Sequence, residues 1–162
     1  MALYQLHLTV VPRKGLLLKH GGIPDQVTVQ IKDGCFYPMT EGYWSLLEVE
    51  PRGISHEIDR MVDRGNFGND EFWLNWKTYT DKVDNDASLT INKETGKVEE
   101  LYFRADLREV RLVFLMEMIE LGRKYDWLFM DIKGNLVNPN WDEIKDLISK
   151  WNKVGFLKNA SI

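Results

Sequence analysis

The chain has 162 residues, of which 44% are hydrophobic and 28% charged, and it carries a formal net charge of −4 at pH 7. These values are typical of a single globular domain over 1–162 and exclude a disordered or fibrous chain. The apolar runs 16–18 and 112–116 are far shorter than the ~20 residues of a membrane-spanning helix, and an acidic chain is poorly suited to bind phosphates. We therefore expect neither a membrane nor a nucleic acid as a partner.

The start of the chain and its cysteine content predict a compartment. Residues 1–7 lack the basic start, apolar stretch and small-residue cleavage site of a secretory signal. Cys35 is the single cysteine, and one cysteine cannot build a disulfide framework. These two features favour a cytoplasmic protein.

The first half of the chain predicts three short strands. Apolar residues alternate over 3–11, up to Pro12, and again over 26–32, which is the pattern of a strand with one buried face. Residues 46–50, closed by Pro51, predict a third strand.

A helix and an aromatic strand are predicted next. Apolar residues recur at helical spacing over 54–62, with Ser55 near the N-cap and Gly65 as the stop. Residues 72–79 place aromatic side chains on both faces of a predicted strand, and a short helix is the competing interpretation.

The following segment predicts a hairpin and then a long helix. The apolar residues before 93–97 lead into a turn with Gly96 at positive φ, and 98–105 forms the return strand. Asp106 and Glu109 have the spacing of a helix N-cap and its capping partner. The helix predicted over 107–121 is apolar on most of its surface, so we expect it to be largely buried and to end at Gly122.

The last third of the chain predicts a second hairpin, 127–131 with 135–137, and a terminal helix capped by Asn140. The apolar stripe of this helix comprises Trp141, Ile144, Leu147, Ile148 and Trp151. Together the elements predict an α+β domain: a mainly antiparallel sheet with a long buried helix and an amphipathic C-terminal helix packed on one face. The other face would then be available for a partner or for a homodimer.

Motifs for catalysis are scarce. His7, His20 and His56 are scattered, with no pair at metal-binding spacing, and neither a phosphate-binding loop nor a Gly-x-Ser-x-Gly nucleophile elbow occurs. We therefore expect no cofactor and no metal, and a non-enzymatic protein is favoured over an enzyme.

Clustered carboxylates are the alternative. Asp81, Asp84 and Asp86 lie within six residues, and Asp106 would join them if the second strand of the hairpin folds back. Such a group could bind a cation or a small ligand in a carboxylate-dependent enzyme. The segment 81–86 nevertheless lacks the glycine and the final glutamate of a calcium loop.

Arg104, Asp106 and Arg108 form the most distinctive charged string. One interpretation is an anion-binding or partner-binding cluster. The favoured interpretation is structural, with Asp106 as the helix cap and the two arginines in ion pairs at the junction of strand and helix.

The middle of the chain is the predicted interaction surface. Residues 41–86 contain eleven acidic and five basic residues, a net charge of −6. This segment could be an ordinary solvated acidic face, or it could steer a basic protein partner. Trp73 and Trp76 would point to opposite faces of one strand, which leaves one of them exposed. The predicted partner-binding residues are Asp70, Glu71, Trp73, Trp76, Asp81, Asp84 and Asp86.

The segments 87–91 (Ala-Ser-Leu-Thr-Ile) and 103–108 (Phe-Arg-Ala-Asp-Leu-Arg), followed by the buried and terminal helices, resemble small cytoplasmic immunity proteins encoded near secreted bacterial toxins. The resemblance covers 72–157 and rests on the strand–helix pattern and one short string. It implies a stoichiometric inhibitor that binds a cognate toxin domain and has no catalytic residues of its own. It assigns no interface residue.

Overall fold

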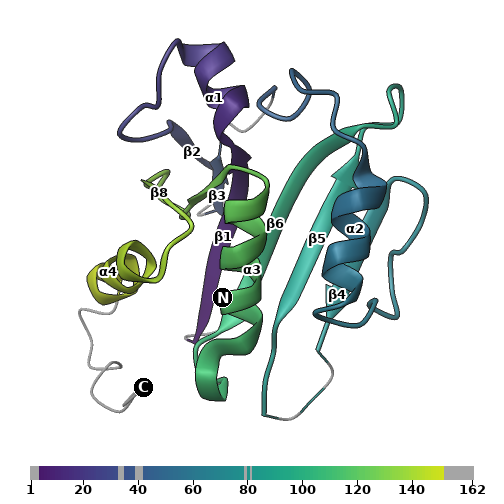
Figure 1. The fold of residues 1–162 in the computed structure, drawn as a ribbon, viewed down its shortest axis with the longest axis vertical. Helices are drawn as coiled ribbons and strands as arrows, with labels where there is room; N and C mark the ends of the chain where they lie inside the picture. The colour runs from purple at the N-terminus through teal and green to yellow at the C-terminus, as the bar shows by residue number, and fades with distance from the viewer. Residues whose placement is uncertain (1–3, 33–34, 39–41, 79, 81, 152–162) are drawn as a thin grey trace.

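The computed structural model describes residues 4–32, 35–38, 42–78, 80 and 82–151, which form an open six-stranded sheet, a separate two-stranded sheet and four α-helices (Figure 1). Every pair of neighbouring strands is antiparallel. The strands of the large sheet, from one edge to the other, are β4 (Trp73–Lys77), β5 (Asp86–Ile91), β6 (Val98–Asp106), β1 (Gln5–Pro12), β7 (Trp127–Met130) and β8 (Leu136–Val137). The small sheet pairs β2 (Val29–Lys32) with β3 (Cys35–Pro38).

Three of the helices share one core with one face of the sheet. Figure 1 shows α2 (Pro51–Asp59) and α3 (Val113–Lys124) in front of the strands and α4 (Trp141–Trp151) to the left of β1. The buried apolar side chains of all three helices form one cluster with Leu6, Leu8 and Val10 of β1. The predicted α+β class, with an antiparallel sheet and helices on one face, is therefore confirmed.

The fourth helix covers the other face near β1. In α1 (Arg13–His20), Leu16 packs with Val11 of β1 and with Leu128 and Met130 of β7, which point away from the main core. Because β1 alternates, its even-numbered residues face α3 and its odd-numbered Val11 faces α1. Within the part of the chain described above, no helix is long and apolar enough to cross a membrane.

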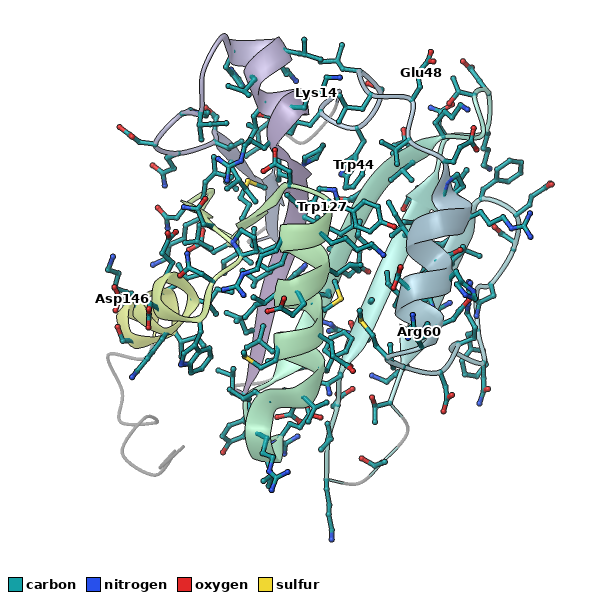
Figure 2. The ribbon with its side chains drawn as sticks, in the orientation of Figure 1. Lys14, Trp44, Glu48, Arg60, Trp127 and Asp146 are labelled. Atoms are coloured by element: carbon teal, nitrogen blue, oxygen red, sulfur yellow. The ribbon has the colours of Figure 1, made fainter. Side chains whose placement is uncertain are left out.

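The segment before α2 is a series of turns, so the strand predicted over 46–50 is wrong. Glu48 has a φ of 49°, which an extended strand does not accommodate. The same segment is anchored by Trp44, whose indole N–H donates to the Val10 carbonyl at 3.1 Å and whose ring meets Trp127 edge-on with centroids 5.6 Å apart (Figure 2).

Two predicted helix boundaries are also wrong. Helix α2 begins at Pro51, and Ser55 lies inside the helix instead of at its cap. Proline suits the first helical position because the backbone N–H groups of a first turn have no partner within the helix, and proline has no N–H to leave unpaired. Helix α3 continues to Lys124, and Gly122 is a packing position, since a Cβ there would lie 2.8 Å from atoms of Phe129 and Pro139.

The start of α3 differs most from the prediction. The chain does not enter the helix at 107, because Arg111 and Leu112 adopt left-handed φ values of 70° and 49° within a short 3₁₀ turn. Asp106 is therefore the last residue of β6 and not the cap of α3. The Glu109 carboxylate instead accepts a hydrogen bond from the Phe114 N–H at 3.2 Å.

The predicted hairpins and the terminal cap are confirmed. Gly96 has a φ of 69° in the turn between β5 and β6. At the start of α4, the Glu143 N–H donates to the Asn140 side chain at 2.9 Å, and the Asn140 amide donates back to the Glu143 carboxylate at 2.9 Å. Asn140 is therefore the N-cap of α4, and the Glu143 carboxylate binds the side-chain amide of Asn140 and not its backbone N–H, which a capping box would require.

Candidate interaction surface at the edge of strand β4

Strand β4 lies at the edge of the sheet, but its outer backbone groups are already hydrogen-bonded to the loop 63–70. An unpaired edge strand is a template for a strand from another chain. Here the loop occupies that position through three backbone hydrogen bonds: Lys77 N–H to Asp63 O at 2.9 Å, Gly65 N–H to Asn75 O at 2.9 Å, and Asp70 N–H to Trp73 O at 3.0 Å. A partner must therefore contact side chains at this edge, because strand addition is blocked.

Two asparagines hold the loop in one conformation. Asn69 accepts the Asn75 backbone N–H at 2.9 Å and donates from its side chain to the Gly65 carbonyl at 2.6 Å. The Asn75 side chain donates to the Phe67 carbonyl. Asp70 completes the network, since one of its carboxylate oxygens accepts the N–H groups of Phe72 at 2.7 Å and Trp73 at 2.8 Å.

Two glycines make this conformation possible. A Cβ at Gly65 would lie 1.8 Å from the Asn75 side-chain oxygen. Gly68 has a φ of +70°, and a Cβ there would lie 1.8 Å from a ring carbon of Trp73. The Trp73 ring therefore rests directly on the backbone of the loop.

The result is two exposed aromatic residues on a fixed backbone. Phe67 is 81% exposed and Trp73 is 41% exposed, and the Trp73 indole N–H is held by the Ser88 hydroxyl at 2.5 Å. Asp70 and Glu71 lie between them in the chain and are both exposed. These four residues, Phe67, Asp70, Glu71 and Trp73, are called the β4-edge surface below.

Trp76 faces the opposite side of β4, as the alternation predicts. It is fully buried, its indole N–H donates to the Asp59 carboxylate at 2.8 Å, and the Arg64 guanidinium lies 4.4 Å from its ring centroid. The Arg64 side chain also pairs with Asp59, and this hydrogen bond is the main reason that the pKa of Asp59 is lowered. Trp76 thus supports the strand from beneath and presents no area to a partner.

Two further predicted partner-binding residues, Asp84 and Asp86, lie at the far end of β4. Lys77 forms an ion pair with Asp84 and approaches Asp86 at 3.6 Å, and Arg104 binds the Asp86 carboxylate through two hydrogen bonds of 2.8 and 2.5 Å. Asp86 is buried, whereas Asp84 remains partly exposed. Asp81 lies outside the described residues.

Asp106 is a buried structural carboxylate. It is fully buried, and it accepts hydrogen bonds from the Asp84 N–H at 2.9 Å and from the Arg108 guanidinium at 2.6 Å. Burial alone would raise the pKa of Asp106, but the hydrogen bonds from Arg108 and from the Asp84 backbone outweigh it and hold this pKa below its usual value. Arg104 and Arg108 thus each neutralise one carboxylate at the end of β6.

The sheet does bring Asp84, Asp86 and Asp106 together, as the alternative carboxylate site requires. Each of the three carboxylates, however, already binds a lysine or an arginine. Among the residues that the structure describes, no group of three or more His, Cys, Asp or Glu side chains is arranged to hold a metal ion. The arrangement is therefore that of an ion-pair network at a strand end.

The acidic middle segment is much less acidic as a surface than as a sequence. Five of its acidic side chains form ion pairs, and three of the cations, Lys97, Arg104 and Lys124, come from outside the segment. Asp70 and Glu71 have no ion pair with a described residue. Asp63, at the Lys77 end of β4, has none either, so the uncompensated charge near β4 is divided between Asp63 and the pair Asp70 and Glu71.

Phe67 is the functional candidate that sequence reasoning missed. It lies between Asn66 and Gly68 in a polar segment that predicts only a loop. An isolated aromatic residue inside a run of Gly and Asn was the available signal, because such a residue cannot reach the core from a tight surface loop. Comparisons with family models, curated proteins and solved structures found no match to this chain.

Proposed function

We propose that this chain is a non-enzymatic binding protein whose β4-edge surface recognises a basic protein partner. The observation that carries the proposal is the rigid loop that holds Phe67 81% exposed beside Trp73. A large aromatic side chain is a frequent anchor of protein interfaces. When its backbone is already fixed by hydrogen bonds, little conformational entropy is lost on binding, so the affinity is higher than for a mobile loop.

The negative charge of this surface supports a positively charged partner. Asp70 and Glu71 flank the rings, and the faces of Phe67 and Trp73 attract cations in addition. A lysine-rich or arginine-rich surface is therefore the complementary one.

Within this function, the most specific form we propose is a stoichiometric inhibitor of a secreted toxin or effector, acting in the bacterial cytoplasm. What supports it is the resemblance of 72–157 to immunity proteins, together with the acidic and aromatic character of the β4-edge surface. In such a complex the partner would supply the basic surface.

The test is a pull-down from a lysate of the native host with three tagged baits, followed by mass spectrometry. The baits are the unaltered chain, Phe67→Ser, and the control Leu18→Ser, which removes another exposed apolar side chain (57% exposed) on α1. We expect one basic protein in equimolar amount with the unaltered chain and with Leu18→Ser, and its loss with Phe67→Ser. Suppression of that protein's toxicity by the bait would support the inhibitor form.

Two results would contradict the proposal. A partner retained equally by all three baits would place the interface away from the β4-edge surface. Recovery of an acidic partner would contradict the assigned charge complementarity.

A further inference from the structure

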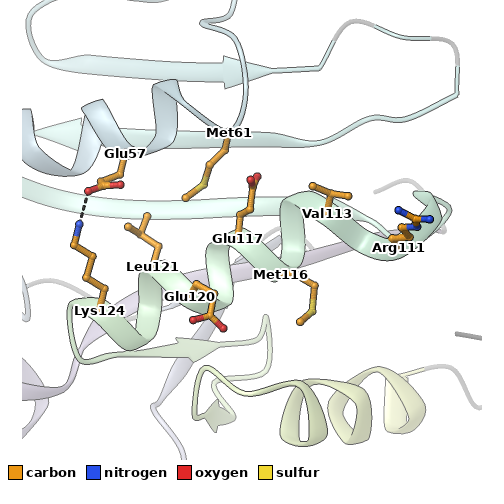
Figure 3. Close-up of a pocket in the computed structure, with 9 residues that line it drawn as sticks. All are labelled: Glu57, Met61, Arg111, Val113, Met116, Glu117, Glu120, Leu121 and Lys124. Atoms are coloured by element: carbon orange, nitrogen blue, oxygen red, sulfur yellow. Dashed lines mark hydrogen bonds and ion pairs between the residues drawn. The ribbon is translucent and has the colours of Figure 1, made fainter.

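A second surface lies on the other side of α2, in the groove between α2 and α3 (Figure 3). The groove has a volume of about 450 Å³ and is open to solvent along its length. Its apolar walls are formed by Met61, which follows α2, and by Val113, Met116 and Leu121 of α3. It shares no lining residue with the β4-edge surface.

Two apolar side chains of this groove are unusually exposed for a helix that packs on the core, whereas Leu121 is buried. Val113 is 47% exposed, Met116 is 38% exposed, and Val110, just before the helix, is 81% exposed. Methionine side chains are flexible and adapt to different apolar surfaces, so Met61 and Met116 suit a binding groove.

The backbone at one end of the groove is also in an unfavourable conformation. Arg111, which lines the groove, and Leu112 both have left-handed φ values, although neither is glycine. Such positions concentrate at sites that bind other molecules. This observation is independent of the apolar side chains.

Glu117 gives the groove its charge preference. Glu57 pairs with Lys124 and Glu120 pairs with Arg123, whereas Glu117 has no ion pair or hydrogen bond with any described residue. Figure 3 shows its carboxylate on the side of α3 that faces Met61. Burial and the neighbouring Glu109 raise the pKa of Glu117, and the opposing charge of Arg60, which forms no ion pair with it, does not outweigh them.

We infer that the α2–α3 groove binds an amphipathic helix of a partner protein, with apolar side chains between α2 and α3 and a lysine or arginine against Glu117. Helix α3 has 12 residues and is therefore about 18 Å long, which matches three turns of a bound helix. An open, shallow groove favours a helix over a small molecule, because small-molecule sites enclose most of their ligand.

The probe for this inference is an 18-residue synthetic helix with a leucine stripe flanked by lysines. A matched peptide carries glutamate in place of each lysine. Binding to the full 162-residue chain is measured by fluorescence anisotropy, and the site is mapped from amide chemical shifts of the ¹⁵N-labelled protein. We expect the lysine peptide to shift residues of α2 and α3, and the glutamate peptide to bind at least tenfold more weakly.

Three variants locate the interaction. Glu117→Gln should weaken the lysine peptide about fivefold, whereas Glu99→Gln, an exposed position that makes the same charge change on β6, should leave it unchanged. Phe67→Ser should also leave it unchanged, which separates this groove from the β4-edge surface. Circular dichroism melts of each variant establish that the fold is retained.

Several results would overturn the inference. If Glu117→Gln and Glu99→Gln weakened the binding of the lysine peptide equally, the binding would be non-specific electrostatic attraction. A dimer in sedimentation that Val113→Asp dissociates would assign the groove to a second copy of the chain. Tight binding of the dye anilinonaphthalene sulfonate at α2 and α3, with no shift by either peptide, would assign it to a small apolar ligand.

Discussion

The β4-edge surface and the α2–α3 groove present apolar side chains to solvent by opposite means. At the β4 edge, Asn69, Asp70 and Asn75 fix the backbone of the loop by hydrogen bonds, and the Trp73 ring lies against Gly68 of this loop. In the groove, flexible side chains such as Met116 are the exposed groups, and the carboxylate of Glu117 forms no ion pair with a described residue. The first surface is suited to one partner geometry, and the second can adapt to several.

The largest expected effect comes from a substitution that disrupts the loop beside β4. Gly68→Ala combines a φ of +70° with a contact of 1.8 Å to the Trp73 ring, so we expect the free energy of unfolding to fall by about 3 kcal/mol. Gly96→Ala is the matched control, because Gly96 has nearly the same φ, +69°, with nothing within 4 Å of the added methyl group, and about 1 kcal/mol is expected there. Urea denaturation measures both. Equal losses would show that Trp73 does not rest on Gly68.

The next effect concerns the support beneath β4. Asp59→Ala removes the acceptor of the Trp76 indole N–H and the partner of Arg64, so we expect a loss of about 1–2 kcal/mol at pH 7. Because the folded-state pKa of Asp59 is lowered, its contribution is present above the unfolded pKa and is lost as the pH falls through the folded pKa. The difference between the two proteins should therefore shrink below about pH 4. A difference independent of pH would assign the loss to packing alone.

A smaller effect tests the strained entrance of the groove. Arg111→Gly places a residue that tolerates a φ of 70° at an exposed position, so we expect a gain of about 0.5 kcal/mol in the free energy of unfolding. Arg52→Gly, at an exposed position inside α2, should instead cost about 1 kcal/mol. Thermal melts compare the two. A loss at both positions would mean that the turn at Arg111 is not strained.

The smallest effect should come from Glu117. Burial and the charge of Glu109 raise its folded-state pKa, so the folded state is most stable below the unfolded pKa and loses stability as the pH rises through the folded pKa. Glu117→Gln should therefore raise the melting temperature slightly at pH 7 and leave it unchanged near pH 4. A lower melting temperature at pH 7 would reveal a stabilising contact of Glu117.

Most of the fold could be predicted from local patterns. The alternation over 3–11 and the turn at Gly96 define strands β1, β5 and β6, because period-2 burial and a positive φ are properties of a few adjacent residues. The beginning of α3 could not be predicted in the same way. The apolar pattern continues through Arg111 and Leu112, and only the tertiary contacts of Glu109 with Asn85 and Phe114 interrupt it.

The candidate surface was predictable only in part. The opposite directions of Trp73 and Trp76 follow from strand geometry, but the exposure of Phe67 depends on hydrogen bonds made by side chains on the following loop and strand. Likewise, the segment charge can be counted from the sequence. The neutralisation of this charge by Lys97, Arg104 and Lys124 cannot be predicted from the sequence, because these cations come close to the segment only in the folded sheet and helices.

The loop that closes the sheet edge has one more consequence. Its shape depends on Gly65, Gly68, Asn69 and Asn75, whereas the Phe67 side chain takes no part in that network. Substitutions at position 67 should therefore cost almost nothing in folding, and the sheet edge should stay covered in each variant. If the proposed function holds, the residue that contacts the partner can change while the loop that presents it is retained.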